Sequence, residues 1–246
     1  MKFYESISQS YDKIFPLKES MVKYVLNNIA DCDKYKLLDI GCATGHLDGA
    51  IAEKGIEVVG IDLNSQMIEY AIDNYRYKNL KFYVMDMLKI NKIFETDSYD
   101  MVTCFGNTLV HLTNEKEIYQ ALKSIRDVMK DEGKLLIQIL NYRYILDNSI
   151  KELPIIENQF IKFERFYSEQ IRDERLIFET RLTIKKTGEV ISNEIYLYPL
   201  LKEQLIGYLQ DLGFGDIKVY KNFDKESYSY NHLPLIVEGV LKENSI

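Results

Sequence analysis

Small residues between two acidic side chains form the stretch of this sequence that is best suited to chemistry. Gly41, Ala43 and Gly45 follow Asp39 at alternate positions, directly after an apolar segment. Because glycine has no Cβ, the backbone of such a turn can approach a ligand closely. Asp62 ends the next apolar segment, about 20 residues after the first glycine, where α/β nucleotide sites place the acid that binds ribose. The spacing predicts a nucleoside-binding site.

Two common nucleotide-binding motifs fit this stretch poorly. A dinucleotide fingerprint reads G-x-G-x-x-G, whereas here Ala43 takes the place of its second glycine and His46 that of its third. A phosphate-binding loop of the G-x-x-x-x-G-K-[ST] type would need a lysine and a hydroxyl residue after Gly45, and neither follows. A dinucleotide-dependent enzyme is therefore the less favoured alternative.

The overall composition sets limits on fold, location and partners. The chain has 246 residues, 46% of them hydrophobic, which is typical of one large globular domain spanning residues 1–246. A net charge of -7 disfavours a polyanionic partner. Cys32, Cys42 and Cys104 lack metal-ligand spacing, so we expect no metal site and a reducing, cytoplasmic location. No apolar run is long enough to span a membrane, and we expect no membrane partner.

Apolar runs alternate with helical patterns through most of the chain. This alternation is typical of a parallel sheet with helices on both faces. The helix before the fifth strand is predicted to begin at Thr113 or Asn114 and to end at Gly133. The predicted strands of this sheet are 36–40, 56–61, 80–85, 100–105, 134–140, 217–220 and 235–241.

An inserted segment interrupts this pattern after the fifth strand. Between residues 159 and 198, apolar and polar residues alternate, which is typical of half-buried strands. Thr187-Gly188 separates two such runs as a turn. About three antiparallel strands are therefore predicted within an insertion of about residues 145–199. Its exposed strand edges could pair two subunits, so a homodimer stays an open alternative.

The pattern Asp39-x-Gly41-x-Ala43-x-Gly45 resembles motif I of the class I S-adenosylmethionine-dependent methyltransferases, with Ala43 departing from that family's middle glycine. Segments 58–67, 84–87 and 105–112 agree with later motifs of the family, and the resemblance extends from Lys36 to Leu241. It implies a Rossmann-like α/β fold. The expected seven-stranded, mostly parallel sheet has the order 3-2-1-4-5-7-6, with helices on both faces and the antiparallel β insertion after the fifth strand.

The resemblance also implies a cofactor site for S-adenosylmethionine, with S-adenosylhomocysteine as the product. Asp62 would accept hydrogen bonds from the ribose hydroxyls and Leu63 would pack on adenine, while Asp86 would accept from the adenine amino group and the Met87 backbone would meet the ring. The residues expected to bind the cofactor are Tyr11, Asp39, Gly41, Cys42, Ala43, Gly45, Asp62, Leu63, Met67, Asp86, Met87 and Phe105. Methyl transfer itself requires no metal.

The acceptor side is expected at the ends of the fourth and fifth strands. His111 and Tyr142 are the candidate catalytic residues, and Asn107, His111, Tyr142 and Arg143 are the candidate substrate-binding residues. A histidine near a helix start is often only hydrogen bonded in place, and Tyr142 and Arg143 could equally be packed as an ordinary loop. An N-terminal segment of residues 1–30 is expected to close over the site as a lid.

The function predicted from these features is methyl transfer to a small-molecule acceptor, at nitrogen rather than oxygen. Among known families, the sequence looks most like bacterial glycine/sarcosine N-methyltransferases. The fourth strand lacks the Asn/Asp-Pro-Pro-aromatic sequence of amino methyltransferases that act on DNA bases, so DNA is not expected as a partner. Methylation of RNA, either tRNA or rRNA, is the alternative. A third and less favoured alternative is a protein that binds the cofactor without catalysis.

Overall fold

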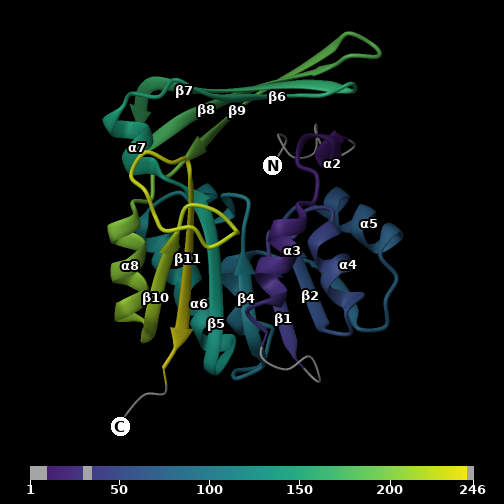
Figure 1. Ribbon diagram of the computed structural model, residues 1–246, viewed down its shortest axis with the longest axis vertical. Coiled ribbons are helices and arrows are strands. Elements are labelled where there is room, and N and C mark those ends of the chain that lie inside the picture. The colour runs from purple at the N-terminus through teal and green to yellow at the C-terminus, as the bar shows by residue number, and fades with distance from the viewer. Residues whose placement is uncertain (1–9, 30–34, 243–246) are drawn as a thin grey trace.

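The computed structural model describes residues 10–29 and 35–242, and its centre is a seven-stranded sheet (Figure 1). The strand order is β10-β11-β5-β4-β1-β2-β3, which is the predicted order 3-2-1-4-5-7-6 read from the other edge. β11 is antiparallel to both of its neighbours, and the other neighbouring strands are parallel. The strands are β1 (Lys36–Ile40), β2 (Glu57–Asp62), β3 (Leu80–Val84), β4 (Tyr99–Cys104), β5 (Met129–Leu140), β10 (Phe214–Tyr220) and β11 (Pro234–Leu241).

Helices cover both faces of this sheet, as predicted, and each face has its own apolar core. Successive strand residues alternate between the two cores, since Leu38 belongs to one and Leu37 to the other. The first core is covered by α6 (Glu115–Val128), α8 (Lys202–Asp211) and the 3-10 helices η2 (Met87–Lys92) and η3 (Thr108–His111). The second is covered by α3 (Glu19–Leu26), α4 (His46–Ala52) and α5 (Ser65–Asn74).

The junction between α6 and β5 differs from the prediction. The helix ends at Val128 rather than Gly133, and β5 begins at Met129, which pairs with Tyr99 of β4. The pairing shifts before the next partners, Met101 and Lys134, so the first part of β5 is irregular. Met129 is buried, and it would be buried whether it belonged to the helix or to the strand. Its apolar character therefore does not determine where α6 ends and β5 begins.

A second sheet lies above the carboxyl ends of the parallel strands (Figure 1). It is antiparallel with the order β6-β7-β8-β9, so the predicted insertion is present but contains four strands rather than three. The missed strand is β6, in which a register shift between Leu153 and Ile156 breaks the alternation. The elements of the insertion are α7 (Tyr142–Asp147), β6 (Glu152–Glu157), β7 (Ile161–Arg172), β8 (Arg175–Ile184) and β9 (Glu189–Leu197).

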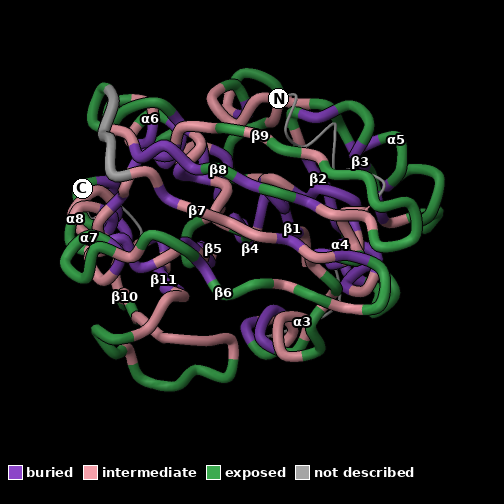
Figure 2. The backbone as a smooth tube through the Cα atoms, turned by 90° about the horizontal axis from the view of Figure 1, so that it is seen from above, coloured by how far each residue is buried: buried purple, intermediate pink, exposed green. Residues whose placement is uncertain are grey.

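A short helix, α2 (Tyr11–Ile14), lies between the inserted sheet and helices α4 and α5 (Figure 1). Its Ile14 is 1% exposed and packs with Ile161, Phe163 and Leu182 of the inserted sheet. Seen from above, that sheet crosses over β1, β2 and β4 (Figure 2). Residues 1–9 and 30 of the predicted lid lie outside the described residues. Within residues 10–29 and 35–242, no helix is both long and apolar enough to cross a membrane.

Candidate active site

A cavity of about 410 Å³ lies between the carboxyl ends of the parallel strands, helix α2 and the inserted sheet. It brings together nine of the predicted site residues: Tyr11, Gly41, Ala43, Asp62, Leu63, Met67, Asp86, Met87 and His111. Their elements meet here because parallel strands place their carboxyl ends at the same edge of a sheet.

The loop from Gly41 to Gly45 depends on both of its glycines. Gly41 has φ +76°, and a Cβ there would lie 2.5 Å from Cγ2 of Thr108. Gly45 has φ +74°, and its Cβ would lie 2.5 Å from Cζ of Phe82. Both positions therefore need glycine for backbone conformation and for packing, while only Gly41 also lines the cavity.

Asp62 sits at the end of β2 and connects two segments of the cavity wall. Its Oδ2 accepts a hydrogen bond from the Ala43 backbone N–H at 3.1 Å, and its Oδ1 accepts from the Asn64 N–H at 2.8 Å. Burial raises the pKa of Asp62, while these backbone donors oppose that rise. A carboxylate has about four acceptor sites, so two remain for a ligand in the cavity.

Asp86 lies two residues after the end of the neighbouring β3, between two apolar cavity residues, Met85 and Met87. It caps η2, because its Oδ1 accepts a hydrogen bond from the Leu88 backbone N–H at 3.0 Å. Lys89 lies 3.8 Å from its other oxygen, at the surface. The carboxylate is therefore held in one orientation beside an apolar wall.

Helix α2 is fixed to the cavity loop through Asp12. Thr44 donates its hydroxyl to Oδ1 of Asp12 at 2.5 Å, and Nδ1 of His46 lies 3.5 Å from the same oxygen. Burial acts to raise the pKa of Asp12, but the contacts with His46 and Thr44 outweigh it and lower the pKa. Tyr11 thereby points into the cavity, and burial followed by the Asp62 charge raises its pKa, so its phenol stays protonated.

His111 reaches the cavity from η3. Burial lowers the pKa of His111 to about 4. The imidazole is therefore neutral near pH 7 and holds a proton weakly. Such a group can exchange hydrogen bonds with a ligand but is a poor base toward an ammonium ion.

The inserted sheet supplies part of the cavity that the sequence analysis missed. Arg175, Glu194, Ile195 and Tyr196 line it from β8 and β9. The Arg175 guanidinium lies 5.1 Å from the Tyr196 ring centroid, and the Tyr196 hydroxyl donates to Oε1 of Glu194 at 3.0 Å. Alternation identified these strands but gave no sign of which end would cover the cavity.

The other predicted residues lie outside the cavity lining. Tyr142 is fully buried, and its hydroxyl accepts from Nδ2 of Asn107 at 2.8 Å. Arg143 lies 4.0 Å from Asp147 at the surface. Phe105 packs on the rings of Tyr24 and Phe223. The remaining three, Asp39, Cys42 and Gly45, are buried in or beside the loop.

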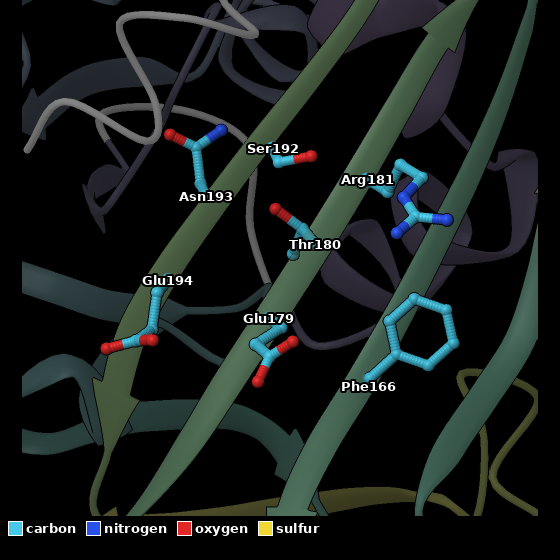
Figure 3. A pocket seen from close by; sticks show the side chains of 7 residues that line it. All are labelled: Phe166, Glu179, Thr180, Arg181, Ser192, Asn193 and Glu194. Atoms are coloured by element: carbon cyan, nitrogen blue, oxygen red, sulfur yellow. The ribbon is translucent and has the colours of Figure 1, made fainter.

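A second hollow, of about 340 Å³, lies on the inserted sheet itself (Figure 3). Phe166, Glu179 and Arg181 contribute to it from β7 and β8, and Glu194 lines both this hollow and the larger cavity. Among the described residues 10–29 and 35–242, no group of three His, Cys, Asp or Glu side chains is placed to hold a metal ion.

The sheet order and the cavity at its carboxyl edge define a Rossmann-like α/β fold with its cavity where such folds bind ligands. The methyltransferase domain family matches residues 31–176, more than half of the sequence, and the chain belongs to this family. It is an S-adenosylmethionine-dependent methyltransferase.

Similar proteins include a glycine/sarcosine N-methyltransferase of Aphanothece halophytica, 24% identical over 84% of this chain and 76% of that protein. Several other curated relatives are matched over only 33% to 64% of their own length. A methyltransferase structure from Clostridium acetobutylicum shares the fold with a TM-score of 0.80 and 14% identity, over 98% of this chain and 100% of that one. The sugar N-methyltransferase KedS8 from Streptoalloteichus superposes with a TM-score of 0.70 and 16% identity, over 96% and 92% of the two chains.

Proposed function

We propose that this enzyme transfers the methyl group of S-adenosylmethionine to a nitrogen atom of a small-molecule amine. The observation that carries the small-molecule part is the closure of the cavity. The inserted sheet and α2 cover about 410 Å³ at the carboxyl edge, a volume within the range of small-molecule sites.

The cofactor half of the cavity fits an adenosine unit. Asp62 offers two free acceptor sites to the two ribose hydroxyls, as argued from its backbone hydrogen bonds. Leu63 and Met87 provide apolar surface for the adenine ring, and Asp86 provides an acceptor beside it. Gly41 leaves the backbone bare where the methionine part would lie.

Acceptor binding is proposed for the side of the cavity formed by η3 and the inserted sheet. Arg175 can bind an anionic group, whereas Glu194 can accept hydrogen bonds from an ammonium or hydroxyl group. His111 and the protonated Tyr11 can exchange hydrogen bonds with the acceptor without carrying charge. We place Tyr142, Asn107 and Arg143 in supporting positions, because the cavity lining does not include them.

When bound, S-adenosylmethionine supplies a methyl group on a positively charged sulfur. The chain's own residues then contribute position rather than acid–base chemistry, because His111 is a weak base and the attacking amine needs only its free lone pair. Holding two reactants in line can contribute roughly 7–11 kcal/mol to lowering the barrier. The names of the glycine/sarcosine and sugar N-methyltransferases support nitrogen as the accepting atom.

The test is incorporation of labelled methyl from S-adenosylmethionine into defined acceptors. The panel is glycine, sarcosine, an amino sugar, a catechol as an oxygen acceptor, and total RNA. Incorporation into one of the amines, absent in the Asp62→Ala variant, would support the proposal. Incorporation only into RNA, or only into the catechol, would refute it.

A further inference from the structure

Two buried acids lie next to the cavity loop, and neither lines the cavity. Asp39 at the end of β1 is 4% exposed, and Asp48 in α4 is 1% exposed. Since ionised carboxylates are rarely buried without cationic or donor partners, this pair needs a physical explanation.

The sheet register brings these two acids together. Asp39 lies opposite Thr103 on β4 and opposite Gly60 on β2. The Thr103 hydroxyl donates to Oδ1 of Asp39 at 2.5 Å. A Cβ at Gly60 would lie 2.8 Å from Oδ1 of Asp48 and 2.7 Å from Cδ1 of Phe82, so the Asp48 carboxyl and the Phe82 ring share the space that this glycine leaves open. It is there in hydrogen-bond contact with Asp39.

The surroundings of Asp48 favour its neutral form. Among the described residues, no hydrogen-bond donor of normal geometry reaches either oxygen of Asp48. A proton shared between the Asp48 and Asp39 carboxyls would fill that gap. Its own backbone N–H lowers the pKa of Asp48, but the side chains that act on it, Asp39 and Asp62, are acidic and raise it. Burial, followed by the Asp39 charge, raises the pKa of Asp48 well above its usual range.

Asp39 differs from Asp48 in two interactions that favour its ionised form. Thr103 donates to it, and His46 lowers its pKa through space. Burial still raises the pKa of Asp39 to about 6, so it is the first of the pair to ionise. Two interacting carboxyls that cannot both ionise lose their protons in two separate steps.

We propose that Asp48 is a positioning residue that keeps its proton at neutral pH and donates it to ionised Asp39. This bond joins the end of β1 to α4, the two elements on either side of the Gly41–Gly45 loop. The pair would then fix the loop that forms one wall of the cofactor site. This inference does not depend on the identity of the methyl acceptor.

Two variants separate the donor from the charge. Asp48→Asn keeps the shape and an N–H donor but cannot ionise, whereas Asp48→Ala removes both. In calorimetry with S-adenosylhomocysteine, we expect the asparagine variant to bind within about threefold of wild type and the alanine variant at least about tenfold more weakly. Asp73→Asn, at an exposed position of α5, is the matched control and should bind like wild type.

The pH dependence of stability tests whether Asp48 holds a proton, because a purely structural role for Asp48 would not change it. A proton that Asp48 keeps in the folded state is lost on unfolding, so the wild-type protein should lose stability as pH rises from 5 to 8. We expect its unfolding constant to rise about tenfold per pH unit relative to that of Asp48→Asn. Equal pH dependence of the two proteins would overturn the proposal. The proposal would also be overturned if Asp48→Ala bound S-adenosylhomocysteine like wild type, or if Asp48→Asn bound it as weakly as Asp48→Ala. If the alanine variant does not fold, the comparison of wild type with Asp48→Asn still decides.

Discussion

Replacing Asp62 with alanine is expected to remove most of the affinity for the cofactor. The two oxygens of Asp62 each accept one backbone hydrogen bond, from Ala43 and Asn64, and two acceptor sites remain for the ribose hydroxyls. Each hydrogen bond to a charged group contributes about 1.5–3 kcal/mol. Loss of both ribose contacts therefore costs about 3–6 kcal/mol, which is about 10²- to 10⁴-fold in Kd.

Calorimetry with S-adenosylhomocysteine measures this loss directly. Glu57→Ala is the matched control, because Glu57 is an exposed acid on the same strand at its opposite end. It should bind like wild type. The affinity of Asp62→Asn for S-adenosylhomocysteine should lie between those of wild type and Asp62→Ala. The asparagine keeps one acceptor oxygen, but its amide N–H faces a backbone donor.

A loss of affinity could also come from a loosened loop, because truncation leaves the Ala43 and Asn64 N–H groups without their acceptor. Urea unfolding of the unliganded proteins measures that part, for which we expect about 1–3 kcal/mol. Equal Kd values for wild type and Asp62→Ala would refute the assignment of Asp62 to ribose. A Glu57→Ala variant as weak as Asp62→Ala would show that the strand, not the carboxylate, determines binding.

Three further outcomes follow from the cavity. His111 has a folded pKa of about 4 against 6.5 when unfolded, so the folded protein loses stability as pH falls from 6.5 to 4, by up to roughly 3 kcal/mol. Urea unfolding should show a smaller loss in His111→Asn, and an unchanged pH slope would contradict the buried neutral imidazole. Gly41→Ala should lower the free energy of unfolding by about 2 kcal/mol or more in the same assay, and the double variant Gly41→Ala/Thr108→Ala should regain part of it. An unchanged urea midpoint in Gly41→Ala would show that the loop tolerates a Cβ. Glu194→Gln and Arg175→Lys should raise the acceptor KM in steady-state kinetics while the Kd for S-adenosylhomocysteine stays constant. If the Kd for S-adenosylhomocysteine rose instead, Glu194 and Arg175 would be assigned to the cofactor half of the cavity.

The parallel core could be predicted because its signals are local. Short apolar runs ending in small or acidic residues mark the strands, and the helices between them have one apolar face. Asn114, one of the two predicted starts of α6, caps that helix, with its side chain accepting the Glu117 backbone N–H at 3.0 Å. The apolar pattern does not fix a boundary where a residue is buried in either conformation, as at Met129.

The pairing of distant positions could not be predicted from the sequence. Gly60 reads as an ordinary small residue within a strand, but the register places it opposite Asp39 and its missing side chain makes room for Asp48. Tyr142 follows the fifth strand as a site residue would, yet its ring turns into the core and its hydroxyl binds Asn107. Such outcomes depend on which way a side chain points, which strand order alone does not determine.

The two halves of the cavity differ in how much of their chemistry the sequence reveals. The cofactor half is built from strand ends and from backbone that glycine leaves accessible, so a short motif such as Asp39 to Gly45 is enough to identify it. The proposed acceptor half is built from side chains of an antiparallel sheet, where Arg175 and Glu194 come from the paired strands β8 and β9. The side chains proposed to select the acceptor lie on the insertion, where the sequence shows only the alternation typical of strands. The reaction type can therefore be predicted from this sequence alone, and the acceptor has to be found by testing the inserted sheet.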